Sequence, residues 1–446
     1  MVDFMEQPNK VLIVSEHASM TFGGEASLPW HYFVRLRQRG VEAWLVVHSR
    51  TREEIERVLP EALDHIHFIP DTGLNVLAWK LSRYMPAQLS YITVGYASRL
   101  STQLTARKIV RKLVRENNID VVHQPIPVSP REPSIMSSLG APVVIGPMNG
   151  NMRYPPAFEK SSRSLRVLSS VLGYARKFSE AMHSVMRGKR EAAFLLVANE
   201  RTRLGLPHGC RGQVVTLVEN GIDTGLWKPR SYDQPAAQGT RFVFMGRLVD
   251  WKAVDILLEA MHRIRDVPGC RLDIIGDGDM RPTLEAQARN LGLTDRVTFL
   301  GFQSQEKCAS LLAQSDALVL SSLYECGGAV VLEAMASGLP VVATAWGGPA
   351  DYLDPSCGIL VEPTSRETLI SGFADAMRAL ANDPALRQRL GTAAYQKALS
   401  QFDWEEKVDQ MQLVYRAASQ GIALGETRLS RKANDKAQTA NSHGFS

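Results

Sequence analysis

The sequence has no long apolar run and few cysteines. No stretch of its 446 residues approaches the ~18 consecutive apolar residues that a membrane-spanning helix needs. The first apolar segment, Val11–Val14, is too short for the core of a signal peptide and is followed at once by Glu16 and His17, so it predicts a buried strand. We therefore expect a cytoplasmic protein.

The cysteines and histidines give no indication of a disulfide framework or a metal site. The cysteines are odd in number and form no Cys-x-x-Cys pair: Cys210, Cys270, Cys308, Cys326 and Cys357. His65 and His67 alternate along a strand-like segment with no third ligand nearby in the sequence. We expect reduced thiols, no metal and no cofactor.

Positive charge is concentrated in the N-terminal half. Residues 1–230 carry 30 Lys and Arg against 20 Asp and Glu, whereas the remaining residues carry 21 against 26. Between Tyr154 and Val197 the pattern is helical, and basic residues interleave with apolar ones over 153–190. Such a segment suits either the solvated face of a helix or peripheral contact with an anionic membrane at the inner face. No nucleic-acid partner is expected.

Short apolar runs alternate with helical patterns in two parts of the chain. In the first part, strands are expected at the following residues: 11–14, 43–47, 66–69, 119–123 and 143–145. In the second part, the alternation begins again at Arg241. Alternation of this kind predicts α/β domains built on parallel sheets, and the chain is long enough for two of them. A hinge is expected within residues 214–229.

The most informative stretch is Ser321–Thr344, which predicts a strand, a loop, a helix and a second strand. Gly327 and Gly328 lie just before the helix. Free N–H groups at the start of a helix bind anions, and glycines let a diphosphate approach the backbone closely. Glu325 in the loop and Glu333 in the helix bracket this point, where carboxylates can accept hydrogen bonds from sugar or ribose hydroxyls.

Arg247 and Lys252 follow the first strand of the second domain. A guanidinium can bind two phosphate oxygens and an ammonium acts as a point charge, so the two can converge on a diphosphate. Taken alone, these cations and the carboxylates of Glu325 and Glu333 are equally compatible with surface charges around a glycine turn that binds nothing.

The segment E-C-G-G-A-V-V-L-E-A-M-A-S-G-L-P-V-V-A-T resembles the signature of retaining glycosyltransferases of family 4, two glutamates separated by seven residues. The resemblance extends over most of residues 10–420 and is strongest in the second domain. It implies that Glu325 lies beside the donor sugar and that Glu333 holds the ribose hydroxyls. It also implies that the diphosphate meets the amides of four residues: Gly327, Gly328, Ala329 and Val330.

The resemblance assigns the remaining parts of a donor site as well. The family's paired Arg and Lys match Arg247 and Lys252, which would neutralise the leaving diphosphate without a metal as the glycosidic bond breaks. A glycine loop that closes over the donor phosphates matches Gly23 and Gly24, which lie between the first strand and the first helix.

The first domain is expected to contribute His123, Asn149 and Gly150. Residues 120–125 resemble the family's D-V-V-H-x-H segment, but Pro125 stands where the second histidine usually reaches the donor sugar. His123 is therefore a catalytic candidate, with a structural histidine at a strand end as the alternative. The segment that ends at Gly150 resembles a G-P-x-G-G variant, which implies that Asn149 and Gly150 line the acceptor side.

The fold implied is α/β, with two Rossmann-like domains facing across a cleft, known as GT-B. An acceptor-side domain is expected over residues 1–225 and a nucleotide-sugar-binding domain over 226–402. A helix over 403–420 is expected to cross back onto the first domain, and the polar residues 421–446 predict a flexible tail.

The function implied is that of a retaining glycosyltransferase. It would move a sugar from a nucleotide-diphosphate sugar to a hydroxyl of a glycan, lipid-linked or small-molecule acceptor, in polysaccharide or glycolipid biosynthesis. Two alternatives stay open. One is a nucleotide-sugar epimerase on the same fold, which needs acid and base residues at the sugar. The other is a non-catalytic partner protein that binds sugar nucleotides.

Overall fold

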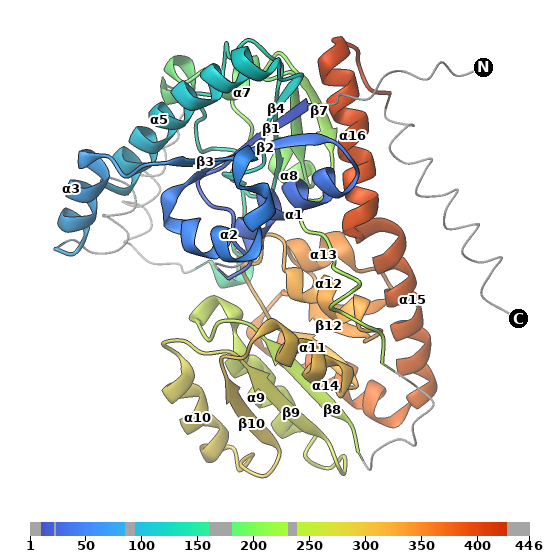
Figure 1. Ribbon diagram of the computed structural model, residues 1–446. Helices are drawn as coiled ribbons and strands as arrows, with labels where there is room; N and C mark the ends of the chain where they lie inside the picture. Colours follow the sequence, from blue (N-terminus) through green and yellow to red (C-terminus); the bar gives the residue numbers. More distant parts are fainter. Residues whose placement is uncertain (1–9, 22–23, 85–93, 160–180, 231–238, 426–446) are drawn as a thin grey trace, which may run out of the picture. The chain divides into compact units, whose positions relative to one another are not determined.

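Two separate parallel sheets organise the chain in the computed structural model (Figure 1). The structure describes residues 10–21, 24–84, 94–159, 181–230 and 239–425. Contacts divide the chain into two units. Unit 1 comprises residues 1–151, 164–219 and 405–435, and unit 2 comprises residues 152–163, 220–404 and 436–446.

Unit 1 is built on a seven-stranded sheet in the order β3-β2-β1-β4-β5-β6-β7, with every neighbouring pair parallel. Its strands are β1 (Lys10–Val14), β2 (Glu42–His48), β3 (Ile66–Ile69), β4 (Val121–Gln124), β5 (Val143–Met148), β6 (Phe194–Val197) and β7 (Gln213–Thr216). Its α-helices are α1 (Gly24–Gln38), α2 (Arg52–Val58), α3 (Gly73–Ser82), α5 (Val94–Asn117), α7 (Gly188–Glu191), α8 (Glu200–Arg203) and α16 (Trp404–Gln420).

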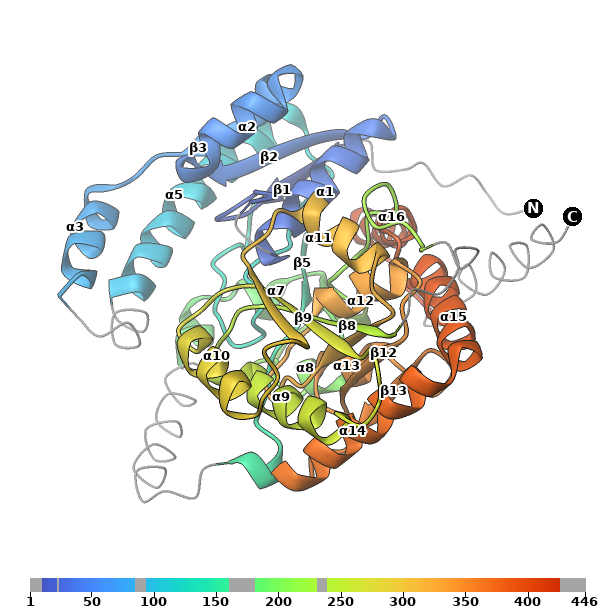
Figure 2. The ribbon, with the colours of Figure 1, turned by 90° about the horizontal axis from the view of Figure 1, so that it is seen from below.

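Unit 2 is built on a six-stranded parallel sheet in the order β10-β9-β8-β11-β12-β13. Its strands are β8 (Arg241–Met245), β9 (Arg271–Ile275), β10 (Val297–Gly301), β11 (Ala317–Leu320), β12 (Val341–Thr344) and β13 (Gly358–Val361). Its α-helices are α9 (Val254–Arg263), α10 (Arg281–Asn290), α11 (Gln305–Ala313), α12 (Ala329–Ala336), α13 (Gly348–Tyr352), α14 (Arg366–Asn382) and α15 (Pro384–Phe402). Helices α9 and α14 pack side by side (Figure 2).

The central strands are largely buried because helices cover both faces of each sheet. All four residues of β11 and of β12 are buried, and β1 is buried from Val11 to Val14. The predicted class, α/β with two parallel sheets, is confirmed, and each of the five strands expected before residue 150 is present.

The helical prediction for residues 154–197 is wrong at its C-terminal end. Phe194–Val197 forms strand β6, which pairs with β5 and β7 and is buried throughout. A run of four apolar residues does not by itself distinguish a buried strand from a helix, because neither periodicity can be seen over so short a length.

Helix α16 follows α15 directly, and from Glu405 onward it belongs to unit 1. Arg39 at the end of α1 binds Glu405 and Asp409, with nitrogen–oxygen distances of 2.6 and 2.7 Å. The buried ammonium of Lys407 donates to the carbonyl of Val218, and burial lowers the pKa of Lys407 to about 7. These contacts hold α16 against unit 1.

His123 makes the most deeply buried polar contact between α16 and the sheet. Its ring, on β4, is fully buried, with Nε2 lying 2.6 Å from the carbonyl of Gly146 and Nδ1 lying 2.7 Å from the hydroxyl of Tyr415. A carbonyl only accepts, so Nε2 carries the proton and Nδ1 accepts from Tyr415. Burial lowers the pKa of His123 to about 4, which keeps the ring neutral.

The segment after α16 begins against β7. The side-chain amide of Gln213 donates to the carbonyl of Leu424 and its oxygen accepts from the Leu424 amide, at 2.5 and 2.8 Å. Leu424 is buried. The first part of the segment predicted as a tail is therefore attached to unit 1, and residues 426–446 lie outside the described residues.

We predict that Tyr415→Phe destabilises unit 1 by about 1–3 kcal/mol, because the buried Nδ1 of His123 then loses its hydrogen-bond donor. Urea unfolding at neutral pH measures this change. Tyr84→Phe, at a side chain that is 89% exposed, is the matched control and should leave the transition unchanged. Equal stability of Tyr415→Phe and the native protein would contradict the structural role of this contact.

Candidate functional site

The loops at the carboxyl ends of β8, β11 and β12 meet at one edge of the unit 2 sheet, where open α/β sheets bind ligands. The hydroxyl of Ser321 donates to the carbonyls of Lys252 and Ala253, each at 2.9 Å. The amide of Leu323 donates to the carbonyl of Trp251 at 2.8 Å. These bonds fix the loop after β11 to the loop after β8.

Lys252 and Glu325 form an ion pair across these two loops. Both side chains are largely shielded from water, with 13% and 16% of their surfaces exposed. Lys252 ends a short 3₁₀ turn, Asp250–Lys252, and the next residue, Ala253, adopts a left-handed conformation with φ of 50° before α9 begins. The sequence predicted these two residues at one site, and the structure places them in contact.

Glycines shape the loop that leads into α12. Gly328 is the N-cap of the helix with φ of 74°, a conformation that favours glycine. Gly347 and Gly348 pack against this loop, because a β-carbon on either residue would collide with the carbonyls of Glu325 and Gly327 respectively. The amide of Gly348 donates to the carbonyl of Glu325 at 2.9 Å. This second glycine pair therefore supports the loop.

Helix α12 begins at Ala329, as predicted, and its first turn is partly exposed at Ala329 and Val330. The first N–H groups of a helix have no partner within the helix, so this turn offers donors to an anion. Glu333 lies one turn further on. Burial raises the pKa of its carboxyl to about 7, so near neutral pH this group exchanges its proton readily.

Arg247 lies in the loop between β8 and the Asp250–Lys252 turn, and its side chain is exposed. The guanidinium carbon is 5.7 Å from the centre of the Trp251 ring, a stacking contact that positions the charge while leaving its donors accessible. Gly246, just before it, has φ of 159°. The structure thus places Arg247 and Lys252 in one loop.

The sequence prediction missed a segment of unit 2 that lies on these loops. The rings of Tyr154 and Tyr324 are 5.2 Å apart, and the indole of Trp346 donates to the carbonyl of Arg153 at 2.8 Å. Tyr324 directly precedes Glu325, and Trp346 directly precedes Gly347. No sequence signal indicates these contacts, because 170 and 193 residues separate the two pairs of partners.

Unit 1 contains a cavity of about 360 Å³ at the carboxyl edge of its own sheet, next to Val14, Ile69 and Gln124. A second cavity, of about 550 Å³, lies between α3 and α5 and shares Arg50 and Ser98 with the first. Amides and hydroxyls line the first cavity alongside charged groups of both signs: Glu16, Glu25, Glu132, Arg50 and Arg99.

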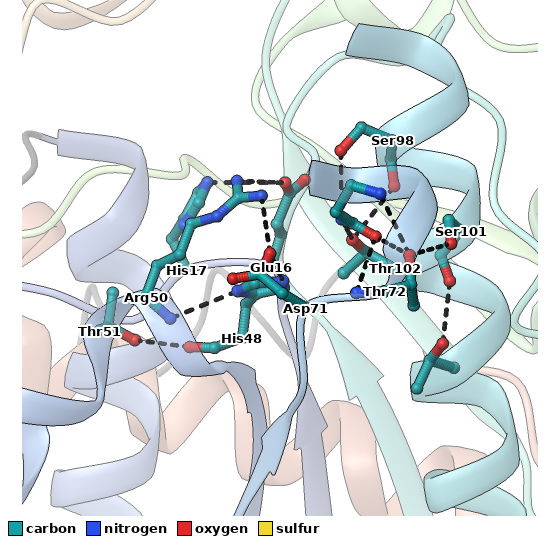
Figure 3. Close-up of polar contacts among 12 residues, drawn as sticks. Glu16, His17, His48, Arg50, Thr51, Asp71, Thr72, Ser98, Ser101 and Thr102 are labelled. Atoms are coloured by element: carbon teal, nitrogen blue, oxygen red, sulfur yellow. Dashed lines mark hydrogen bonds and ion pairs between the residues drawn. The ribbon is translucent and has the colours of Figure 1, made fainter. Parts of the chain in front are cut away.

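The charges of the first cavity are largely paired. Arg99 binds Glu132 at 2.9 Å, and Arg50 lies 4.0 Å from Glu16 and 3.4 Å from Asp71 (Figure 3). Burial is the main cause that lowers the pKa of His17, which lies near Glu16. A cavity with paired charges and many hydroxyl and amide groups suits a neutral, hydroxyl-rich ligand.

The other residues predicted for the first domain lie inside unit 1. His123 is enclosed in the core with both ring nitrogens engaged, an arrangement that fits the alternative of a structural histidine, and its catalytic role stays a prediction. Asn149 donates to Glu219 at 2.9 Å, and the amide of Gly150 donates to Thr202 at 3.0 Å. Both residues are buried, and their place on the acceptor side stays a prediction.

The predicted glycine loop is described only in part. Gly24 is the first residue of α1, is exposed, and has open space around a β-carbon position. Gly23 lies outside the described residues. Within the described ranges, no group of three or more His, Cys, Asp or Glu side chains could hold a metal ion, and all five cysteines are free thiols.

Residues 233–397 match the model of a family described as glycosyl transferases group 1. The match covers 165 of the 446 residues. The group 1 segment contains every unit 2 residue predicted for the donor site. Glycogen synthase of Mycobacterium tuberculosis (strain CDC 1551 / Oshkosh) is 34% identical over 217 residues, which are 48% of this chain and 51% of the relative. The chain spans about half the length of the curated relatives it matches.

Two solved structures resemble the whole chain in fold. Sucrose-phosphate synthase from Thermosynechococcus elongatus has a TM-score of 0.64 and 20% identity, and the match covers 92% of this chain and 98% of that one. Anabaena HepE in complex with UDP has a TM-score of 0.60 and 17% identity, covering 91% and 99%. At these identities the likeness establishes the fold alone, and it confirms the predicted GT-B class.

We predict that Glu333→Gln stabilises unit 2 at about pH 8 and not at about pH 4.5. The folded pKa of about 7 exceeds the ordinary 4.5, so ionisation of the native carboxyl costs stability as pH rises from 4.5 through 7. Glutamine does not ionise and so avoids this cost. We therefore expect the free energy of unfolding of Glu333→Gln to exceed the native value by about 2–3 kcal/mol above pH 7. Thermal unfolding across this pH range measures it, with the exposed Glu362→Gln as the control. A gain that does not depend on pH would contradict the assignment.

Proposed function

We propose that this protein is a retaining glycosyltransferase that takes a sugar from a nucleotide-diphosphate donor and transfers it to a hydroxyl acceptor. The observation that carries the proposal is the Lys252–Glu325 ion pair beside the glycine-capped start of α12, within a segment of the group 1 family. An anion site, a shielded cation and two carboxylates, Glu325 and Glu333, thus lie along one loop and helix.

The charges suit the chemistry of the leaving group. Negative charge grows on the diphosphate as the bond to the anomeric carbon breaks, and preorganised cations and amides stabilise it. Lys252 and Arg247 follow the same strand, and α12 begins at Ala329, four residues after Glu325. When Lys252 binds phosphate, it releases the carboxylate of Glu325 toward the sugar.

Glu333 suits recognition of ribose. A carboxylate that burial makes costly to ionise gains from hydroxyl donors, because two hydroxyl groups can satisfy its oxygens. Anabaena HepE, which shares the fold, is described in complex with UDP, and this supports a nucleoside diphosphate as the leaving group here.

The acceptor is proposed to be a neutral, hydroxyl-bearing molecule bound by unit 1, either a glycan, a lipid-linked sugar or a small molecule. The cavity of about 360 Å³ supports this, because Arg99 is paired with Glu132, Arg50 lies near Glu16, and amides and hydroxyls line the cavity beside these charges. Glycogen synthase, a relative over half its length, is named for a reaction on a polysaccharide. A role in polysaccharide or glycolipid synthesis is consistent with both observations.

We predict that Lys252→Ala lowers the transfer rate about 100-fold or more, because one charge that stabilises the leaving diphosphate is lost. A panel of UDP-, GDP- and ADP-sugars is screened first by thermal shift and slow donor hydrolysis, and turnover is then measured with the donor selected. Lys307→Ala, an exposed lysine on α11, is the control and should keep full activity. Normal turnover in Lys252→Ala would overturn the donor site.

We also predict that the product keeps the anomeric configuration of the donor. Proton NMR of the products formed during slow donor hydrolysis reports the configuration at first appearance, before mutarotation. A product of opposite configuration would show an inverting mechanism. A product epimerised at another carbon would favour the epimerase alternative.

A further inference from the structure

Helix α3 packs against α5 through polar side chains. Asn75 is 2% exposed, and its amide donates to Ser98 at 3.1 Å and to Thr102 at 2.9 Å. The hydroxyl of Thr72, which caps α3, lies 2.8 Å from that of Ser101 (Figure 3). The contacts described between the α3 segment and α5 are therefore made by polar side chains.

Three leucines of α3 point to solvent instead. Leu74 is 49% exposed, Leu77 56% and Leu81 46%, and their spacing of three and four residues places them on one face of the helix. Val76 on α3 and Tyr84, two residues after the end of α3, are exposed as well. This arrangement is the reverse of an ordinary surface helix, which buries its apolar face.

These residues form a cluster, unlike the scattered apolar side chains normal on protein surfaces. Twelve large apolar side chains are exposed in the described part of the chain, and five of them fall within residues 74–84. A sixth, Leu104, lies on α5, which packs beside α3 (Figures 1 and 2). We call residues 73–84 together with α5 the α3–α5 surface.

The α3–α5 surface is strongly basic. It contains Glu116 as its single acidic residue, against eight basic ones: Lys80, Arg83, Arg99, Arg107, Lys108, Arg111, Lys112 and Arg115. On α5, Leu104, Lys108 and Lys112 follow one another at four-residue steps, so an exposed apolar side chain continues into a row of exposed ammonium groups. The apolar and cationic features thus share one surface.

We propose that the α3–α5 surface docks on an anionic membrane, with the leucines of α3 at the boundary between headgroups and acyl chains. An exposed apolar face beside clustered Lys and Arg is the pattern that binds such interfaces, because apolar burial and attraction to anionic headgroups add together. Charge complementarity with lipid headgroups accounts for the basic residues, and acyl chains account for the exposed leucines. An RNA would account for the basic residues alone.

This surface differs from the one suggested by the sequence. The sequence predicted membrane contact through residues 153–190, of which 160–180 lie outside the described residues. In the described chain no helix is long and apolar enough to cross a membrane, so the contact proposed here is peripheral. The residues that carry it, Leu77 and Leu81 on α3 and Lys108 and Lys112 on α5, lie outside both the proposed donor site and the cavity of about 360 Å³.

The test is co-sedimentation of the full chain with vesicles of phosphatidylcholine, with and without phosphatidylglycerol. We expect binding to the anionic vesicles and little to the neutral ones. The double variant Leu77→Ser/Leu81→Ser should lose most of the binding that remains at high salt, where electrostatic attraction is screened. Leu204→Ser, at a leucine of unit 1 that is 72% exposed, is the matched control and should bind normally.

A second variant, Lys108→Gln/Lys112→Gln, tests the charge. At low salt we expect its affinity for anionic vesicles to fall about fivefold for each lysine removed. Lys228→Gln/Lys307→Gln, at two exposed lysines of unit 2, controls for net charge. Melting temperature and sugar-nucleotide binding, measured in all variants, should stay at native values and show that each variant is folded.

The proposal is overturned if the native chain ignores anionic vesicles, or if the leucine variant binds them as the native chain does. It is also overturned if binding to an RNA homopolymer outcompetes vesicles and does not change on loss of the leucines. If the native chain binds no sugar nucleotide, the proposed transferase function is contradicted and the vesicle result is unaffected.

Discussion

The Lys252–Glu325 ion pair is the contact on which the geometry of the proposed donor site depends. Two opposite charges are held in a poorly hydrated position because Ser321 and Leu323 tie their loops together through backbone atoms. Removing either charge would leave the other shielded and unpaired, which is costly. In the proposed reaction, a diphosphate would replace the carboxylate as the partner of the lysine.

In unit 1, a different set of contacts holds the C-terminal helix, α16. Arg39 holds α16 at the surface, whereas His123 and Tyr415 connect it to the sheet in the core. Both ring nitrogens of His123 form hydrogen bonds, and its lowered pKa keeps the ring neutral. His123 therefore connects β4 to α16 without carrying a charge. The polar groups that remain for a ligand in unit 1 are those around the cavity at the carboxyl edge of the sheet.

On the α3–α5 surface, helix α3 exposes leucines and packs through polar side chains, which is the opposite of an ordinary amphipathic surface helix. Asn75 and the hydroxyls of α5 make the packing contact, and the leucines of α3 stay in solvent. Exposed apolar area is unfavourable in water, so a helix of this kind is expected to gain stability when another apolar phase covers it. A membrane surface would place unit 1, with its hydroxyl-lined cavities, next to lipid headgroups.

The sequence by itself determined the two parallel sheets and the strand, loop and helix around Gly328. It also placed Glu325 in that loop and Glu333 in that helix. Hydrophobic periodicity, glycine positions and helix ends are local properties of the sequence, so they can be recognised without the fold. The sequence also indicated Lys252 by family resemblance. Only the tertiary structure decided that His123 is enclosed by Tyr415, that Tyr154 lies on Tyr324, and that α3 buries its asparagine. Each of these depends on residues far apart in the chain, and which side of a short helix is covered follows from packing and not from its own sequence.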